Sequence, residues 1–268
     1  MGEQGQENKD LQNHWQRQEK VEKKQIEVSD RTRVEPGRFL MRKTIVCLGL
    51  VASVAMVMAG PAWASRKQLA KRIEQATEYF QDLMEAPDYS IPQTLLQTCR
   101  GVIIIRQYKA GFVVGVKGGA GVVLVRDEKS KVWSPPAFVA SGEGSFGFQI
   151  GGQAIDAVLL IMNREGMEML ARSKFKIGVD ASAAVGPVGR DAAAKISPGT
   201  AILVYSRTRG LYAGAAFEGG VLVSDDKANE EFYGKKGITL RDILFRGAVK
   251  MPGEALPLVE LLQKYASP

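Results

Sequence analysis

Short apolar runs rich in valine, isoleucine and glycine dominate the middle of this chain of 268 residues. Four of these runs occupy residues 102–105, 112–116, 121–125 and 138–140. Runs of this length and composition are typical of β-strands. Glycines interrupt the strand patterns at Gly115, Gly147, Gly178 and Gly214. Since glycine inside a strand indicates a bend or a close backbone contact, the sequence predicts a strongly curved, barrel-like sheet.

Helical periodicity flanks the predicted strands. Between residues 65 and 86, apolar side chains recur at spacings of four and three, and Pro87 follows. This spacing predicts an amphipathic helix. Further helices are predicted at residues 93–98, 164–173, 226–233, 240–247 and 254–265, and a hairpin at 196–217. The predicted fold class is therefore α+β: a glycine-rich, mostly antiparallel sheet with an N-terminal amphipathic helix and C-terminal helices.

The first 64 residues differ from the rest. Residues 1–40 mix Gln, Glu, Lys and Arg with almost no aliphatic clusters, so we expect them to be disordered, or untranslated if the true start is Met41. Residues 41–64 have the order of a secretion signal: Arg42 and Lys43, an apolar run at 45–59, and Ala62-Trp63-Ala64. The apolar run is shorter than the roughly 20 residues of a spanning helix, which makes a membrane anchor the second interpretation. We expect cleavage near Ala64, export to the periplasm or cell envelope, and a mature domain at 65–268.

The predicted mature domain lacks several kinds of chemistry. It contains no histidine, because the only one in the chain is His14, and Cys99 is its single cysteine. An intrachain disulfide, a Ser-His-Asp or Cys-His system and a histidine-based zinc or haem site are thereby excluded for residues 65–268. We expect a non-enzymatic domain with no metal and no cofactor.

The net charge of the predicted mature domain is moderately positive and favours anionic partners. The chain carries a formal charge of +7, and residues 65–268 hold 26 Lys and Arg against 21 Asp and Glu, which leaves +5. The basic residues are dispersed without interleaved aromatics, so nucleic acid is not an expected partner.

A basic cluster opens the first predicted helix. It consists of Arg66, Lys67, Lys71 and Arg72. Positive charge near a helix N-terminus opposes the helix dipole by a few tenths of a kcal/mol. An external anionic partner explains the cluster, and a solvated helical face explains it equally well.

A glycine motif and two charged residues are candidate sites. Residues 142–147 match G-x-G-x-x-G, but 148–152 continue like a strand and not like the helix that a dinucleotide site requires. Asp156, within an apolar segment, is either a general base or, as we favour, a structural acid held by backbone amides or an arginine. Arg190 is either a headgroup contact, a surface arginine or the partner of such an acid.

Several blocks in order give the sequence a family resemblance. They are GGAGVV (118–123), WSPPA (133–137), GSFGFQIGG (144–152), AVGPVGR (184–190), YSRTRGLYAG (205–214) and FYG (232–234). Together they resemble the SYLF lipid-binding family over roughly residues 69–262. Some members are eukaryotic adaptor and actin-patch proteins, and others are bacterial secreted proteins that consist of little else.

The resemblance implies binding of anionic phospholipid or phosphoinositide headgroups through a basic N-terminal amphipathic helix. It implies lipid contacts for Arg66, Lys67, Lys71 and Arg72, to which we add Arg190. We expect peripheral membrane association in which basic side chains meet headgroups and the apolar face of the helix dips into the interface. Actin is not an expected partner, because the chain has a secretion signal and no SH3 or FYVE module. The alternative is a structural or protein-interaction module of the envelope that forms homo-oligomers through exposed strand edges.

Overall fold

In the computed structural model of the chain, the residues described belong to the unit Trp63–Pro268. The described residues are 64–86, 90–111, 114–146, 151–172, 174–189, 192–208, 211–212 and 220–267. The predicted tail, the predicted signal up to Trp63, and Arg190 lie outside these residues. Among the helices that are described, none is both long enough and apolar enough to cross a membrane.

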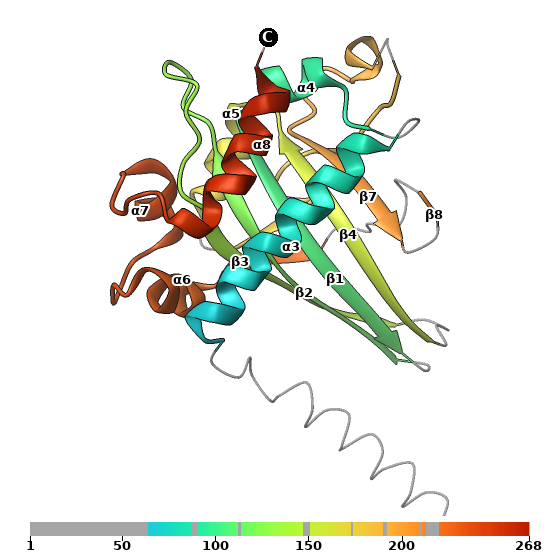
Figure 1. Ribbon diagram of the computed structural model, residues 1–268. Helices are drawn as coiled ribbons and strands as arrows, with labels where there is room; N and C mark the ends of the chain where they lie inside the picture. The colour runs from blue at the N-terminus through green and yellow to red at the C-terminus, as the bar shows by residue number, and fades with distance from the viewer. Residues whose placement is uncertain are drawn as a thin grey trace, which may run out of the picture. The chain divides into compact units, whose positions relative to one another are not determined.

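The described strands form one sheet whose neighbours are nearly all antiparallel (Figure 1). The strands are β1 (Gly101–Gly111), β2 (Val114–Val125), β3 (Ala137–Phe146), β4 (Gly151–Ile161), β5 (Lys174–Ile177), β6 (Ala183–Val185), β7 (Ile202–Thr208), β8 (Leu211–Tyr212) and β9 (Gly220–Ser224). Their order is β5-β9-β3-β2-β1-β4-β7-β6, with β8 paired to β7. Only the β6–β7 pair is parallel among these. The predicted α+β class with a mostly antiparallel sheet is confirmed.

The two ends of the strand order meet. β5 and β6 are joined by a short turn in which Gly178 has a φ of +82°, and Ile177 bridges Ala181. A side chain at φ > 0 is strained, so glycine suits this reversal. The curved sheet is thereby nearly closed, as predicted from its glycines. Gly147 and Gly214, which were included in that prediction, lie outside the described residues.

Two predicted strand boundaries were wrong. The runs 112–116 and 121–125 were expected to be separate strands, but one strand, β2, continues through Gly118 and Gly119. These glycines pair with Tyr108 and Gln107 of β1, which likewise extends beyond the predicted 102–105. The long β1–β2 and β1–β4 ladders supply hydrogen bonds that override the low strand propensity of glycine. The G-x-G-x-x-G segment lies within β3 as far as Phe146, in agreement with the strand interpretation.

The helices match their predicted positions closely. They are α3 (Arg66–Glu85), α4 (Gln93–Thr98), α5 (Arg164–Leu170), α6 (Asp226–Tyr233), α7 (Leu240–Phe245) and α8 (Leu256–Ala266). Two short 3-10 turns are η1 (Ala193–Lys195) and η3 (Gly253–Ala255).

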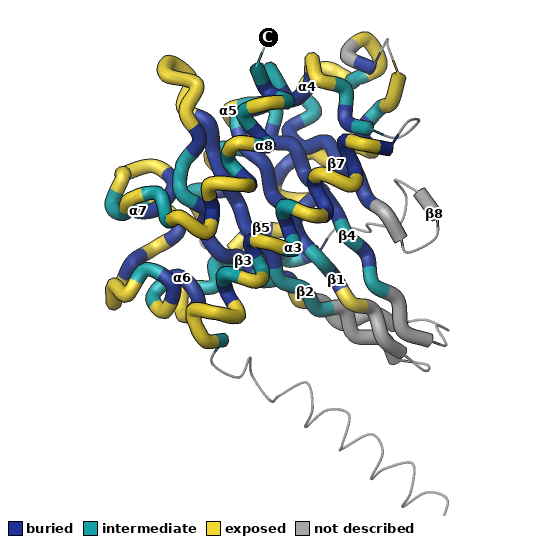
Figure 2. The backbone as a smooth tube through the Cα atoms, in the orientation of Figure 1, coloured by how far each residue is buried: buried dark blue, intermediate teal, exposed yellow. Residues whose placement is uncertain are grey.

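Alternation along β1 divides the apolar side chains between two cores. Val102 and Ile104 join a cluster that includes side chains of α3, α4, α6 and α8. Ile103 and Ile105 join a second cluster inside the curved sheet, together with side chains of α5 and α7. Figure 1 shows α3 and α8 lying across one face of the sheet, and Figure 2 shows that the strands beneath them are buried. α3 is thus held on the sheet by its apolar side.

Candidate functional site

α3 carries four of the five predicted lipid contacts, and its own apolar face is buried. The backbone N–H of Ser65 donates to Gln68 Oε1 at 3.0 Å and caps the start of the helix. Leu69, Ile73 and Phe80 are fully buried against the sheet. The expectation that this face dips into a membrane is therefore wrong for the folded domain, because these side chains form its core.

Arg66 is occupied by contacts within the protein. Its Nη2 lies 2.6 Å from Glu254 Oε1, and its Nη1 donates to the backbone carbonyl of Phe232. The guanidinium also lies 4.6 Å from the centre of the Phe232 ring. The N–H of Glu254 and then the Arg66 hydrogen bond lower the pKa of Glu254. Arg66 thus joins the N-terminus of α3 to α6 and η3.

Arg72 is likewise part of the fold. Its Nη1 lies 3.2 Å from Asp225 Oδ2, and both side chains are about four-fifths buried, at 21% and 17% exposure. The guanidinium lies 5.6 Å from the centre of the Phe138 ring. Asp225 in turn caps α6 by accepting from the N–H of Ala228. Arg72 therefore links α3 to β3 and to the start of α6.

Lys67 and Lys71 differ from the two arginines. Both are exposed, and the described ion pairs include neither of them. The first turn of α3 contains no acidic residue. Glu74 and Glu78 follow on the same side of the helix, since residues three and four apart are neighbours there. The basic side chains of α3 that the described ion pairs leave out are therefore the two lysines in its N-terminal half.

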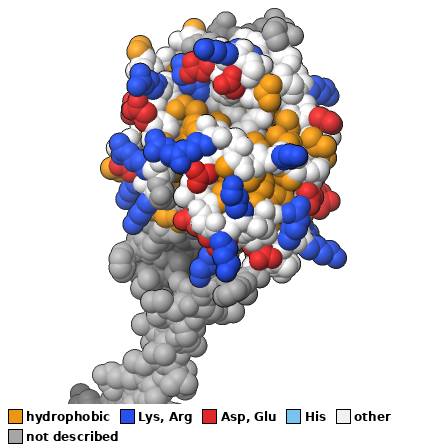
Figure 3. Space-filling model, turned by 90° about the vertical axis from the view of Figure 1, so that its left-hand side faces the viewer, with side chains coloured by type: hydrophobic (Ala, Val, Ile, Leu, Met, Phe, Trp, Pro, Cys, Tyr) orange, Lys and Arg blue, Asp and Glu red, His pale blue; other side chains and the backbone are white. Residues whose placement is uncertain are grey.

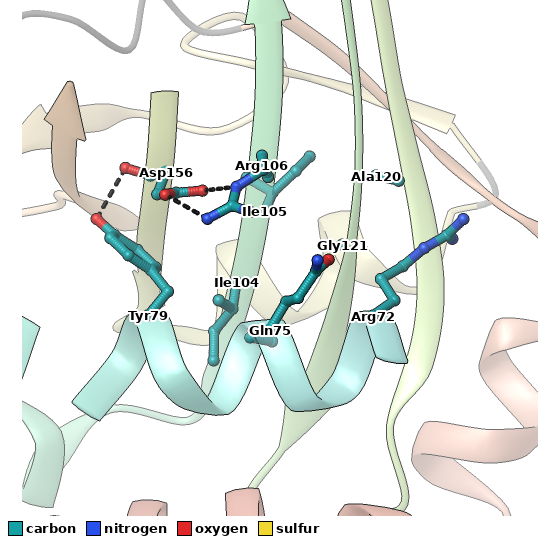
Figure 4. A pocket seen from close by; sticks show the side chains of 10 residues that line it. Arg72, Gln75, Tyr79, Ile104, Ile105, Arg106, Ala120, Gly121 and Asp156 are labelled. Carbon is teal, nitrogen blue, oxygen red and sulfur yellow. Dashed lines mark hydrogen bonds and ion pairs between the residues drawn. The ribbon is translucent and has the colours of Figure 1, made fainter. Parts of the chain in front are cut away.

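Asp156 is a structural acid, as favoured from the sequence. It lies directly opposite Arg106 in the β1–β4 ladder. Arg106 Nη2 donates to Asp156 Oδ2 at 2.8 Å, and Arg106 Nε donates to Oδ1 (Figure 4). The hydrogen bond that Arg106 donates to Asp156 is the main cause that raises the pKa of Arg106. The hydroxyl of Tyr79, on α3, donates to the backbone carbonyl of Asp156 at 2.8 Å. The partner of the acid is thus Arg106.

A small pocket lies between α3 and the sheet beside this ion pair (Figure 4). Its lining residues are Arg72, Gln75, Ala76, Tyr79, Ile104, Ile105, Arg106, Ala120, Gly121 and Asp156. The volume open to water is about 30 Å³, which is room for about two water molecules. An acyl chain or a metabolite does not fit there. The pocket under α3 is therefore large enough for water only.

The described residues offer little for metal or thiol chemistry. No three His, Cys, Asp or Glu side chains of the described chain lie close enough together to hold a metal ion. Cys99 is 4% exposed, and burial raises the pKa of its thiol to about 12. A buried thiol of this kind is unreactive in the folded state.

Sequence reasoning missed the partners of the arginines. Asp225, Glu254 and Phe232 are more than 150 residues from Arg66 and Arg72, and no local pattern connects them. Helical spacing did contain a signal, since Arg66 precedes buried Leu69 by three and Arg72 precedes buried Ala76 by four. Both arginines therefore border the buried face.

Comparisons with known proteins agree on one family. The Ysc84 family model, described as "Las17-binding protein actin regulator", matches residues 142–265. SH3 domain-containing YSC84-like protein 1 of Rattus norvegicus is 32% identical over 213 residues, which is 78% of this chain and 62% of the relative. The Xenopus laevis protein of that name is 32% identical over 182 residues, 67% of this chain and 54% of the relative. Protein YSC84 of Saccharomyces cerevisiae is 32% identical over 184 residues, 67% of this chain and 39% of the relative.

The chain thus spans less than two thirds of the length of these relatives. No solved structure matches it. The residues matched by the family model include the blocks at 144–152, 184–190, 205–214 and 232–234 on which the resemblance rested, whereas the blocks at 118–123 and 133–137 precede them. The chain belongs to the Ysc84 family, whose domain is the SYLF domain.

Proposed function

We propose that this domain is a peripheral, non-catalytic lipid-binding module that contacts anionic phospholipid or phosphoinositide headgroups through α3. The observation that carries the proposal is the exposure of Lys67 and Lys71 at the N-terminal half of α3. The neighbouring arginines are occupied by Glu254 and Asp225, whereas these two ammonium groups face solvent. The Arg106–Asp156 ion pair supports the non-catalytic part of the proposal, since the carboxylate considered as a general base is held by Arg106.

The proposed contact is electrostatic. Each basic side chain near an anionic membrane surface contributes about 1 kcal/mol. Two lysines together contribute about 2 kcal/mol, or about a 30-fold change in partitioning. Because this attraction falls off within a Debye length of about 8 Å at physiological salt, binding weakens as salt rises. The proposal retains the expected export, so the membrane in question is one of the cell envelope.

Vesicle flotation tests the proposal. The full chain and residues 64–268, once the latter shows cooperative thermal unfolding, are floated with neutral, anionic and phosphoinositide-containing vesicles at low and high salt. The double variant Lys67→Ala/Lys71→Ala is compared with Lys129→Ala/Lys195→Ala, which removes two exposed lysines from other elements. Salt-sensitive flotation that the first variant loses about 30-fold, and the second retains, supports the proposal. Residues 64–268 that stay at the bottom with every vesicle refute it.

Protein interaction is the second candidate function, and β6 favours it. Val179 and Val185 are 72% and 58% exposed around this edge strand, and Val188 is 37% exposed. An exposed apolar edge strand can pair with another chain, because it presents unpaired backbone N–H and C=O groups. The family description names Las17 binding and actin regulation, so a filament is one such partner to test. Concentration-dependent oligomers, or cosedimentation with actin filaments, that Val185→Lys abolishes would favour this function over lipid binding.

A further inference from the structure

A second basic surface follows α6, outside the predicted lipid contacts. Residues 235–250 contain five Lys and Arg and one Asp, a net charge of +4. All five basic residues are exposed: Lys235, Lys236, Arg241, Arg246 and Lys250. Two of them are engaged, since Arg246 pairs with Asp242 at 2.8 Å and Lys235 donates to the Ala248 carbonyl at 3.4 Å. The described contacts leave Lys236, Arg241 and Lys250 to the solvent.

An aromatic side chain lies within this basic segment. Phe245, the last residue of α7, is 41% exposed, whereas Leu240, Ile243 and Leu244 of the same short helix are at most 6% exposed. Arg241 precedes Phe245 by four residues and so shares its side of the helix. The core does not need the exposed part of the ring. An aromatic ring among cations is the composition of a surface that lies in a membrane interface.

The segment is held in place by its own hydrogen bonds. Thr239 and Asp242 form a capping box in which the N–H of Thr239 donates to Asp242 Oδ2 at 3.1 Å and the N–H of Asp242 donates to Thr239 Oγ1 at 3.2 Å. Ile238 and Leu240 are buried in the second apolar cluster, inside the curved sheet. α7 is therefore presented rigidly, so little conformational entropy is lost when it contacts a partner.

The same side of the domain carries the start of α3. Arg66 binds the Phe232 carbonyl and thereby places the N-terminus of α3 against α6. Figure 1 shows α6, α7 and this end of α3 on one side of the sheet, and Figure 3 views that side. Lys and Arg side chains surround hydrophobic ones there. The N-terminus of α3 and the basic segment after α6 therefore lie on the same side of the domain.

We propose that Lys236, Arg241, Phe245 and Lys250, here called the α7 surface, form a second membrane contact in which the Phe245 ring enters the headgroup region. This inference rests on the proposed function, because it assumes the same anionic membrane. Charge complementarity favours that occupant: three cations for which the described residues show no ion pair meet phosphate groups while the ring is withdrawn from water. An acidic protein that binds the surface is the outcome that would overturn it.

The magnitude follows from the exposed part of the ring. A phenylalanine side chain buries roughly 200 Å², of which 41% is exposed here. Transfer of half of that exposed area out of water corresponds to about a fivefold gain in partitioning. Removal of the three cations lowers partitioning by roughly 100-fold at low salt, since each contributes about 1 kcal/mol.

Flotation of matched variants tests the α7 surface. Phe245→Ala is paired with Val132→Ala, which removes another exposed apolar side chain, and Lys236→Ala/Arg241→Ala/Lys250→Ala with Lys129→Ala/Lys174→Ala/Lys195→Ala. The expected losses on anionic vesicles are about fivefold and about 100-fold for the α7 variants, with controls near wild type. Wild-type flotation that depends on Lys67 and Lys71 but not on the α7 variants overturns this inference and leaves the proposed function standing. Failure of the wild type to float refutes both.

A fluorescence readout is independent of affinity. Residues 64–268 contain one native tryptophan, Trp133, which is 2% exposed. The variant Phe245→Trp therefore adds a second, exposed tryptophan whose emission can be followed against the constant emission of Trp133. Anionic vesicles are expected to shift its emission to the blue, and brominated lipids to quench it. Emission that stays unchanged while the protein is bound overturns the insertion of residue 245. Binding of an acidic peptide in preference to vesicles does so as well.

Discussion

Substitution by alanine is expected to affect different properties at two neighbouring residues of α3, Lys71 and Arg72. Arg72→Ala removes an ion pair with Asp225 and a contact with the Phe138 ring, both within the fold. Lys71→Ala removes an exposed side chain for which the described residues show no ion pair. The first substitution should therefore lower stability, and the second should lower membrane binding.

The size of the stability loss follows from burial. Surface ion pairs contribute up to about 1 kcal/mol, and removal of one partner from a fully buried pair costs about 3–5 kcal/mol. At 21% and 17% exposure the Arg72–Asp225 pair lies between these limits. We expect a loss of about 2 kcal/mol in the free energy of unfolding, including the ring contact. For a domain of this size that lowers Tm by about 4–8 °C. Lys71→Ala should stay within about 0.5 kcal/mol of wild type.

Thermal and urea unfolding of the variants measure this difference. Arg72→Met serves as a control that keeps the apolar length of the side chain, and it should recover only the packing part of the loss. A double-mutant cycle with Asp225→Ala should give a coupling energy of about 1 kcal/mol or more. The reasoning is refuted if Arg72→Ala melts within about 1 °C of wild type, or if Lys71→Ala is equally destabilised.

Three further outcomes are expected. Gly121→Ala should destabilise by about 3 kcal/mol or prevent folding, because the new Cβ would lie 2.2 Å from the Ile104 carbonyl, whereas Gly142→Ala meets nothing within 4 Å and should melt near wild type. In Cys47→Ser protein, Cys99 should react with a thiol reagent at pH 8 only at the rate of unfolding, since burial raises its pKa to about 12; fast labelling would contradict this. Hydrogen bonds from Thr239 and then from Arg246 lower the pKa of Asp242 from 3.8 to about 2, so its stabilising contribution is full above pH 4 and is lost as the pH falls towards 2. A carboxyl NMR titration with a midpoint near 4 would refute the last point.

Local features of the chain were predictable because their signals are local. α3 begins and ends where the apolar spacing and Pro87 place it, and α6 begins after a capping aspartate. Curvature was predictable from Gly178, since a glycine between two short strands indicates a reversal. These inferences needed only neighbours in the sequence.

The interactions that determine the site are not local. Asp156 meets Arg106 because β1 and β4 pair with a register that joins residues 50 apart, and apolar runs do not specify a register. The roles of Arg66 and Arg72 depend on α6 and η3, whose contacting residues are more than 150 positions away in the sequence. Charge type alone therefore grouped four basic residues that the fold divides into two pairs.

That division limits how the domain can bind a membrane. Insertion of α3 would remove Leu69, Ile73 and Phe80 from the core, where each contributes about 1.5–3 kcal/mol by burial. The two exposed lysines contribute only about 2 kcal/mol in return, so α3 should remain on the sheet when the domain binds. Any apolar contact with lipid must then come from a side chain that the core does not use. Phe245 meets that condition, and its contribution should persist at salt concentrations that screen Lys67 and Lys71. The salt dependence of Phe245→Ala and of the double lysine variant should therefore differ: the loss caused by removal of the ring should be nearly constant, while the loss caused by removal of the lysines should shrink as salt rises.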